Sequence, residues 1–344
     1  MGPEEWDDPF FPGVIGSYRI TGQIGSGTFG EVQQAVHCVT GKTVALKQVY
    51  LKQPVRGPAG LSNPAQNVQR EIAALRALKH PNVVTLLDVI PRGDSHVLVM
   101  ELCSTDLAAA LEHAKWRWDR PLIRALLQQL LQGIAACHQA GYLHRDLKPA
   151  NLLLTAEGAL KVGDLGLARP HDAPAGGRAA AYTCTVATRW YRAPELLLGS
   201  RRYGPAADMW AVGCIFAEML GMCPLFPGES DFDQLGRVVE ILGSIRLPDW
   251  PEAEHMPDFR KLCFMETPAT DLKELYPDAS AQEVDLLTHL IQWNPGDRLT
   301  AEQALQHEYL SAVSQVKALE DCKQLVAWTV SAQAAGKQNK PWAQ

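Results

Sequence analysis

Two short polar motifs limit what this chain can be: HRDLKPAN at residues 144–151, and DLG beginning thirteen residues after its end, at residues 164–166. Transfer of a γ-phosphoryl group needs a carboxylate beside the attacking hydroxyl and oxygen ligands that hold Mg²⁺ on the phosphates. Asp146 can supply the carboxylate, and Asn151 and Asp164 can supply hard oxygen ligands for Mg²⁺. Each motif alone could be an exposed turn, but their order and spacing together predict a phosphoryl-transfer site.

A glycine-rich segment, IGSGTFGEV at residues 24–32, predicts a loop that binds phosphate. Its three glycines have no Cβ, so backbone amides can approach a phosphate closely. By itself this pattern suits a dinucleotide-binding fold or a hairpin turn equally well. The apolar run VALK at residues 44–47 reads as a strand, which indicates that the loop joins two strands and does not open a helix. Lys47 is then the phosphate-binding lysine, although such a lysine can also be a surface residue with a buried stem.

Asn63 and Pro64 are typical of a helix start, and apolar residues recur at helical spacing from there to Lys79. Glu71 lies one turn before Leu75 on nearly the same face of this predicted helix. A carboxylate there can mark the edge of a solvated face, or it can pair with a cation from another element.

Together these motifs resemble those of eukaryotic protein kinases, and the chain is similar to the cyclin-dependent kinase branch over about residues 18–310. The resemblance implies an α+β, bilobal protein kinase fold, with a small β-rich N-lobe carrying one main helix and a larger, mainly helical C-lobe. It implies a Ser/Thr protein kinase that uses ATP and Mg²⁺. The expected division is an extension at residues 1–17, an N-lobe at 18–100, a hinge at 101–105, a C-lobe at 106–310, and a C-terminal helix and tail at 311–344.

The resemblance also gives roles to single positions. Asp146 orients the substrate hydroxyl or takes its proton, Lys148 neutralises the transferred phosphoryl as in Ser/Thr kinases, Thr188 bridges these two, and Glu71 pairs with Lys47. The hinge backbone binds the adenine edge, and apolar side chains that would otherwise be core enclose the ring. The residues expected to surround the nucleotide are Ile24, Gly25, Ser26, Gly27, Thr28, Phe29, Gly30, Val32, Ala45, Lys47, Met100, Glu101, Cys103, Asp106 and Leu153.

A phosphorylation switch is expected between the DLG motif and the later APE motif. Thr183 occupies the activating position, and a phosphate there carries about −1.5 to −2 charges. Arg70, Arg145 and Arg169 match the three arginines that bind such a phosphate in cyclin-dependent kinases. The run WYR at residues 190–192 resembles the part of this branch that favours proline after the phosphoacceptor, which implies protein substrates with Ser/Thr-Pro sites.

Further matches concern architecture and regulation. Asp208 is expected to brace the catalytic loop, and Arg298 to pair with Glu195. Leu165 replaces the usual Phe of the DFG motif, an apolar exchange that packing tolerates. The helix around Glu71 lacks the best-known cyclin-binding motif, so a cyclin-like activator and an upstream activating kinase remain open partners.

Composition excludes several other classes of protein. The 344 residues carry a net charge of −6, so nothing suggests bulk binding to nucleic acid or to an anionic membrane. Eight cysteines without a CxxC pair favour a reducing compartment. No signal sequence or membrane span is predicted, so we expect the cytoplasm, the nucleus or a cilium, with a role in cell-cycle or cilium-length signalling.

Two alternatives stay open: a pseudokinase scaffold that binds nucleotide or a partner without phosphotransfer and, more distantly, a dinucleotide oxidoreductase. The C-terminal segment at residues 312–330 predicts a helix on the large lobe that can also dock a partner, with a disordered tail after Gly336.

Overall fold

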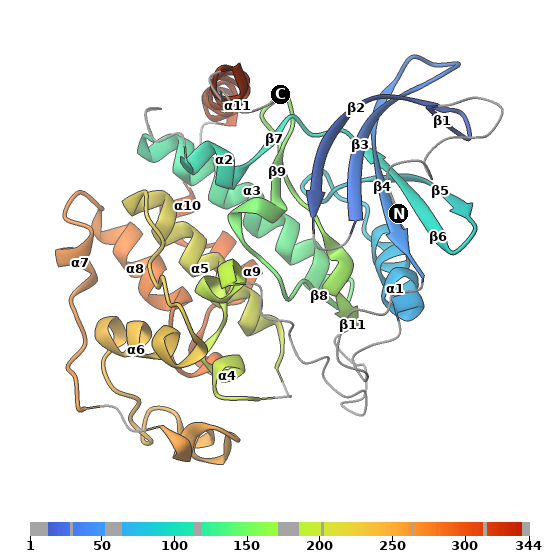
Figure 1. The fold of residues 1–344 in the computed structure, drawn as a ribbon. Helices are drawn as coiled ribbons and strands as arrows, with labels where there is room; N and C mark the ends of the chain where they lie inside the picture. The colour runs from blue at the N-terminus through green and yellow to red at the C-terminus, as the bar shows by residue number, and fades with distance from the viewer. Residues whose placement is uncertain are drawn as a thin grey trace.

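The computed structural model describes residues 13–27, 30–51, 64–112, 118–170, 186–200, 203–262, 265–311 and 315–338. A curled sheet with one long helix is followed along the chain by a mainly helical lobe (Figure 1). This is the α+β, two-lobed arrangement that the sequence predicts.

The N-lobe is built on a six-stranded antiparallel sheet with the order β1-β2-β3-β4-β6-β5. Its central strand β4 buries six consecutive residues, because the sheet continues on both sides of it and helix α1 packs against it. The elements of this lobe are β1 Val14–Ile15, β2 Tyr18–Gly27, β3 Gly30–His37, β4 Thr43–Tyr50, α1 Pro64–Ala77, β5 Leu86–Arg92 and β6 Ser95–Glu101.

The apolar residues at positions 83–89 predict one strand in the sequence, but this prediction is wrong at its start. Strand β5 begins only at Leu86, while Val83 forms an isolated parallel bridge with Val162 of the other lobe. The amide of Val84 also donates to the carbonyl of Val162 at 3.0 Å. Residues 83–85 are therefore a link between the two lobes.

The C-lobe is organised around helix α5, Pro205–Gly221, whose residues from Ala207 to Met219 are all buried. A helix that is apolar on all sides has to lie inside the protein. Helices α3 and α8 pack against it. The other helices and strands of this lobe are β7 Thr105–Asp106, α2 Leu107–Glu112, α3 Arg120–Gln139, β8 Tyr142–Leu143, β9 Leu152–Leu154, β10 Leu160–Val162, β11 Arg169–Pro170, α4 Pro194–Leu197, α6 Asp231–Leu242, α7 Leu272–Leu275, α8 Ala281–Leu290, α9 Ala301–Leu305 and α10 Glu308–Ser311.

The C-terminal helix α11, Gln315–Gln338, extends beyond the predicted end at residue 330 and past Gly336. It packs against α2, α3 and β7. Residues 339–344 of the predicted tail lie outside the described part of the chain.

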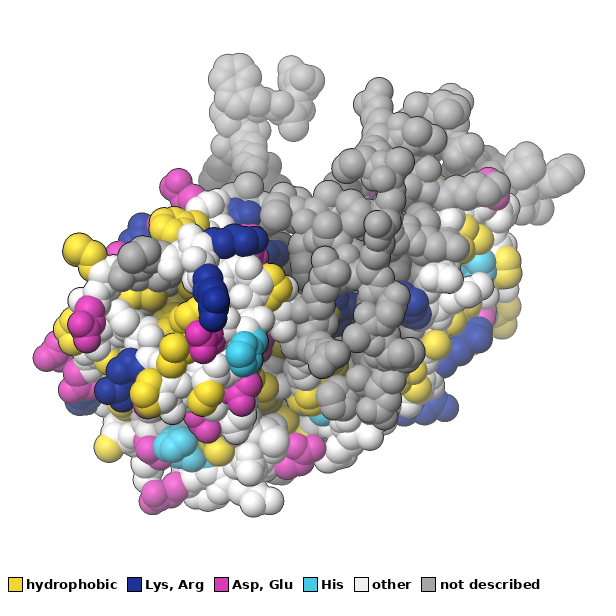
Figure 2. All heavy atoms as spheres, turned by 90° about the horizontal axis from the view of Figure 1, so that it is seen from below, with side chains coloured by type: hydrophobic (Ala, Val, Ile, Leu, Met, Phe, Trp, Pro, Cys, Tyr) yellow, Lys and Arg dark blue, Asp and Glu magenta, His cyan; other side chains and the backbone are white. Residues whose placement is uncertain are grey.

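On the face seen in Figure 2, the described part of the C-lobe is not dominated by side chains of one chemical type. Acidic, basic and apolar side chains are interspersed there, as the modest net charge suggests. Among the described residues, no helix is both long and apolar enough to cross a membrane.

Candidate active site

One buried lysine joins three elements at the boundary of the lobes. The Nζ atom of Lys47, on β4, lies 2.8 Å from Glu71 Oε1 of α1 and 2.8 Å from Asp164 Oδ1. Lys47 is held in place because β4 pairs with β3 on one side and with β6 on the other. The prediction that Glu71 pairs with Lys47 agrees with this geometry.

This cluster has more negative than positive charge. Burial alone would lower the pKa of Lys47, but the two carboxylates beside it raise the pKa. Burial raises the pKa of Glu71, whereas Lys47 overcomes burial at Asp164 and lowers the pKa of that carboxyl. One ammonium group thus faces two carboxylates, and a bound cation would compensate the excess charge.

The catalytic loop brings Asp146, Lys148 and Asn151 together. Asp146 Oδ2 accepts a hydrogen bond from Lys148 Nζ at 2.8 Å and another from Asn151 Nδ2 at 3.1 Å. Asn151 Nδ2 also donates to the main-chain carbonyl of Asp146 at 2.7 Å. The other carboxylate oxygen, Asp146 Oδ1, is buried and accepts no hydrogen bond from any described residue. This oxygen can accept a hydrogen bond from a substrate hydroxyl.

The same residues suit a magnesium ion. The amide nitrogen of Asn151 is used within the loop, which leaves its carbonyl oxygen as a ligand, and Asp164 offers the oxygen that does not bind Lys47. Across the described ranges, no three His, Cys, Asp or Glu side chains form a cage for a metal. Mg²⁺ usually takes one or two carboxylates and completes its shell with phosphate and water. The donor set therefore fits Mg²⁺ bound together with a nucleotide.

Helix α5 fixes the backbone of the catalytic loop through hydrogen bonds to Asp208. Asp208 accepts hydrogen bonds at 2.9 Å from the amides of His144 and Arg145, as predicted, and lies 2.9 Å from His138 Nε2. Arg145 has a φ of 73°, and Asp164 has a φ of 53°, so both adopt the left-handed conformation that side chains disfavour. Strain at residues beside a reacting centre is typical of a preorganised site.

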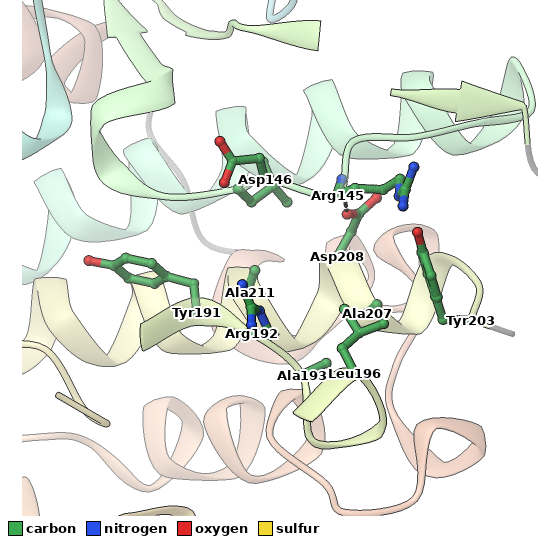
Figure 3. Close-up of a pocket in the computed structure, with 11 residues that line it drawn as sticks. Arg145, Asp146, Tyr191, Arg192, Ala193, Leu196, Tyr203, Ala207, Asp208 and Ala211 are labelled. Atoms are coloured by element: carbon green, nitrogen blue, oxygen red, sulfur yellow. Dashed lines mark hydrogen bonds between the residues drawn. The ribbon is translucent and has the colours of Figure 1, made fainter. Parts of the chain in front are cut away.

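A small pocket lies beneath this loop, between it and the segment that precedes α4 (Figure 3). The guanidinium of Arg145 sits 5.0 Å from the ring centroid of Tyr203, a contact that sequence reasoning missed. No local pattern pointed to it, since 58 positions separate the two residues.

Two architectural predictions are confirmed. Arg298 donates to both carboxylate oxygens of Glu195, at 2.9 and 2.8 Å, with both side chains buried. Leu165 is 1% exposed and packs in the apolar cluster that contains Leu75 of α1 and Leu78, the residue that follows this helix. The exchange of Phe for Leu in the DLG motif therefore keeps an apolar contact between the lobes.

The glycine-rich segment is a hairpin between β2 and β3, with Gly25 opposite Val32 and Ser26 opposite Glu31. A strand-to-strand loop excludes the strand-to-helix motif of dinucleotide-binding folds. Ile24, Gly27 and Gly30 belong to this hairpin. Thr28 and Phe29 at its tip lie outside the described residues.

The expected adenine region forms where β4 and β6 meet the hinge. Ala45 lies opposite Met100, and Leu153 lies opposite Asp106. The Glu101 side chain bonds Lys161 Nζ at 2.9 Å and the Thr85 amide at 2.7 Å, and its own amide donates to the Thr85 carbonyl at 3.1 Å, so these groups of Glu101 already have partners.

Two further positions, Cys103 in the hinge and Asp106 just after it, have different surroundings. Within the described chain the Cys103 amide has no backbone partner, which suits an adenine acceptor. The Asp106 carboxylate accepts from the Ala109 amide at 2.9 Å and thus caps α2, a structural role beside the predicted one.

The expected phosphorylation switch is only partly visible. Arg70 lies on α1 beside Glu71, and Arg145 lies in the catalytic loop. Thr183, together with the side chains of Arg169 and Thr188, falls outside the described part of the structure.

Comparison with known proteins agrees with this geometry. The family model described as "Protein kinase domain" matches residues 18–310, and the chain belongs to that family. Within it, the chain is a kinase of the cyclin-dependent type. It is 47% identical over 293 residues to cyclin-dependent kinase 20 of Mus musculus, covering 85% of this chain and 82% of that protein. The human cyclin-dependent kinase 20 is 45% identical over the same shares. Cyclin-dependent kinase D-1 of Oryza sativa subsp. japonica is 40% identical over 308 residues, covering 89% of this chain and 70% of that protein.

Proposed function

We propose that this kinase transfers the γ-phosphate of ATP to serine or threonine hydroxyls of protein substrates that carry proline after the phosphoacceptor. The observation that carries the proposal is the buried Asp146 carboxylate, with one oxygen bonded by Lys148 and Asn151 and the other without a hydrogen-bond partner among the described residues. The substrate oxygen forms a bond to the γ-phosphorus as the bond from that phosphorus to the β–γ bridging oxygen breaks, and ADP leaves. Asp146 orients the hydroxyl and accepts its proton.

Each remaining residue has a defined task in this proposal. Lys47 binds the α- and β-phosphates and is oriented by Glu71, and Lys148 offsets charge on the transferred phosphoryl. Asn151 and Asp164 would hold Mg²⁺, which neutralises phosphate charge when bound.

The preference for proline is supported by the resemblance of the WYR run and by how firmly this run is held. Arg189 Nε and Arg192 Nη1 both bond Asp231 Oδ1, at 3.2 and 3.1 Å, and Trp190 Nε1 donates to the Gly228 carbonyl at 3.1 Å. This segment is therefore anchored to the start of α6. A peptide library should show proline selected after the phosphoacceptor, and equal rates for Ser-Pro and Ser-Ala peptides would refute the preference.

Activity is proposed to depend on phosphate at Thr183, bound by Arg70, Arg145 and Arg169. A phosphate opposite an arginine cluster forms several charge-assisted hydrogen bonds that order the segment carrying it. Thr183→Ala should lower kcat strongly, and turnover equal to that of Thr183-phosphorylated wild type would contradict this switch.

The competing proposal is a scaffold that binds nucleotide without transferring phosphate. Phosphotransfer is favoured over a scaffold because Lys47, Glu71, Asp146, Asn151 and Asp164 are all present, with Lys47 bonded to Glu71 and Asp164 and Asn151 bonded to Asp146. A radiolabel transfer assay with Thr183-phosphorylated wild type and Asp146→Asn separates the two. Transfer that survives the substitution would reject the mechanism, and the absence of transfer by wild type in the presence of an activator would favour the scaffold.

The cellular proposals rest on resemblance alone: a cell-cycle or cilium-length role, a cytoplasmic, nuclear or ciliary location, and regulation by a cyclin-like subunit and an activating kinase. The relatives' printed names support the cyclin-like partner. Imaging of the tagged chain and mass spectrometry of its purified complexes would test them.

A further inference from the structure

Helix α11 lies outside residues 18–310, which match the protein kinase domain, and it packs against the elements that follow the hinge. In Figure 1 it sits beside α2, close to the start of β7. Cys322, Leu325, Val326 and Thr329 on one face of this helix are at most 3% exposed. Their spacing of three and four residues places them on a single stripe, so the middle turns of α11 are docked.

The first contact of α11 is with the turn between β9 and β10. Gly158 in this turn has a φ of +83°, and a Cβ added there would lie 2.8 Å from Lys323 N, 2.9 Å from Leu319 O and 3.0 Å from Cys322 Cβ. The hairpin backbone and the helix backbone therefore touch directly. Only glycine satisfies both the left-handed conformation and this close approach.

The second contact is with β7, the strand that follows the hinge. Thr105 is buried, and its Oγ1 donates a long hydrogen bond of 3.4 Å to Gln333 Oε1 of α11. Strands β10, β9 and β7 form one three-stranded sheet in that order. The helix thus contacts this sheet at the β9–β10 turn and again at its opposite edge.

This sheet carries the parts of the site expected to hold adenine. Leu153, in the middle strand, pairs with Asp106 on one side and Lys161 on the other. The Ser104 amide at the end of the hinge donates to the Leu154 carbonyl at 2.8 Å. Lys161 also bonds the hinge residue Glu101, so displacement of the sheet would move both the floor of the pocket and the hinge.

We propose that α11 is a positioning element for nucleotide binding, with Gly158 and Leu325 as the residues through which it acts. Docked α11 fixes the β9–β10 turn and β7, and thereby sets Leu153 and the hinge for the adenine ring. The inference rests on the proposed function, because it takes Mg·ATP as the nucleotide bound in this pocket.

Gly158→Ala tests the proposal in the full-length chain. Titration calorimetry with Mg·ADP should show binding weakened about fivefold or more, the lower range of coupling between separate sites. The KM for ATP should rise in parallel, while kcat and the KM for a Ser-Pro peptide stay unchanged. Gly41→Ala is the control, since Gly41 also has a left-handed φ of +69° but has no heavy atom within 4 Å of an added Cβ.

A second pair of variants tests the helix itself. Leu325→Ala removes a fully buried side chain that docks α11, whereas Val330→Ala shortens a side chain that is 40% exposed on the same helix. Leu325→Ala should reproduce the Mg·ADP defect, and Val330→Ala should not. Wild-type Mg·ADP affinity in both Gly158→Ala and Leu325→Ala would overturn the inference, as would an equal defect in the Gly41 control. Failure of wild type to bind Mg·ADP would instead contradict the proposed function.

Discussion

Asp208→Asn is the sharpest test of how this catalytic loop is held. The Oδ2 atom of Asp208 accepts from the His144 amide and contacts His138 Nε2, while Oδ1 accepts from the Arg145 amide. An asparagine keeps the shape of the side chain but replaces one acceptor by an NH₂ donor. The orientation that keeps two of the contacts places this donor against the Arg145 N–H.

The expected loss of free energy follows from replacing this one hydrogen-bond acceptor by a donor. Loss of a hydrogen bond to a charged acceptor costs about 1.5–3 kcal/mol. The left-handed conformation of Arg145 is about 1–2 kcal/mol less favourable than the right-handed one, so the freed residue tends to relax. A rate falls tenfold for about 1.4 kcal/mol, so a loop displaced from its active geometry by this amount lowers kcat about tenfold to a hundredfold.

The assay is steady-state phosphorylation of a Ser-Pro peptide, with Mg·ADP affinity measured in parallel. Affinity should change much less than kcat, because Lys47 and its carboxylate partners are not in contact with Asp208. Glu218→Gln is the matched control, since it neutralises another buried acid of α5, the one that accepts from Tyr191. Wild-type kcat in Asp208→Asn would refute the argument that Asp208 holds the loop.

The same substitution has a pH signature. Burial would raise the pKa of Asp208, but the hydrogen bonds from His138 and the loop amides lower it below its ordinary value of 3.8. The carboxylate therefore stabilises the fold above this ordinary pKa, and its contribution is lost as the pH falls through the lower folded value. The difference in melting temperature between wild type and Asp208→Asn should be largest near neutral pH. It should shrink as the pH falls below 3.8 and through the lower pKa of the folded state.

Three further predictions concern packing and reactivity. Glu195→Ala leaves the Arg298 guanidinium buried without a counter-charge and should lower the free energy of unfolding by about 3–5 kcal/mol, measured as a lower melting temperature. A decrease of less than about 1 kcal/mol would contradict a buried ion pair. Gly133→Ala places a Cβ 2.5 Å from a backbone carbonyl oxygen and should lower the melting temperature sharply, whereas Ala at the open helical position Gly236 should not. Burial, followed by the charge of the neighbouring Glu101, raises the pKa of Cys103 to about 12. Iodoacetamide at pH 8 should therefore label this thiol slowly, as followed by peptide mass spectrometry, and rapid labelling would show that the thiol is not shielded.

The catalytic loop was predictable from sequence because its key groups lie close together in the chain. Asp146, Lys148 and Asn151 span six positions, and one 3₁₀ turn at Pro149–Asn151 is enough to bring their side chains into contact. The meeting of Lys47 with Asp164, 117 positions apart, is different. Spacing alone does not imply it, and the sequence predicts only separate roles for the two residues, at the phosphates and at Mg²⁺.

Contacts between distant elements without a motif were not predictable. The apolar run from Val83 looks like one strand, but its first residues pair with Val162 because that backbone is the partner within reach. Helix α11 continues past Gly336, since a glycine costs only about 1 kcal/mol relative to alanine in a helix and the neighbouring alanines favour one.

His144 shows why a residue's chemistry does not by itself reveal its task. A histidine two positions before a catalytic carboxylate suggests proton transfer. Here its ring is fully buried, with Nε2 2.8 Å from the Gly163 carbonyl and Nδ1 accepting from the Asp146 amide at 3.2 Å. The neutral tautomer with a proton on Nε2 satisfies both contacts. His144 therefore joins the loop that carries Asp146 to the strand that leads into Asp164, and these two bonds help to fix the distance between the two carboxylates.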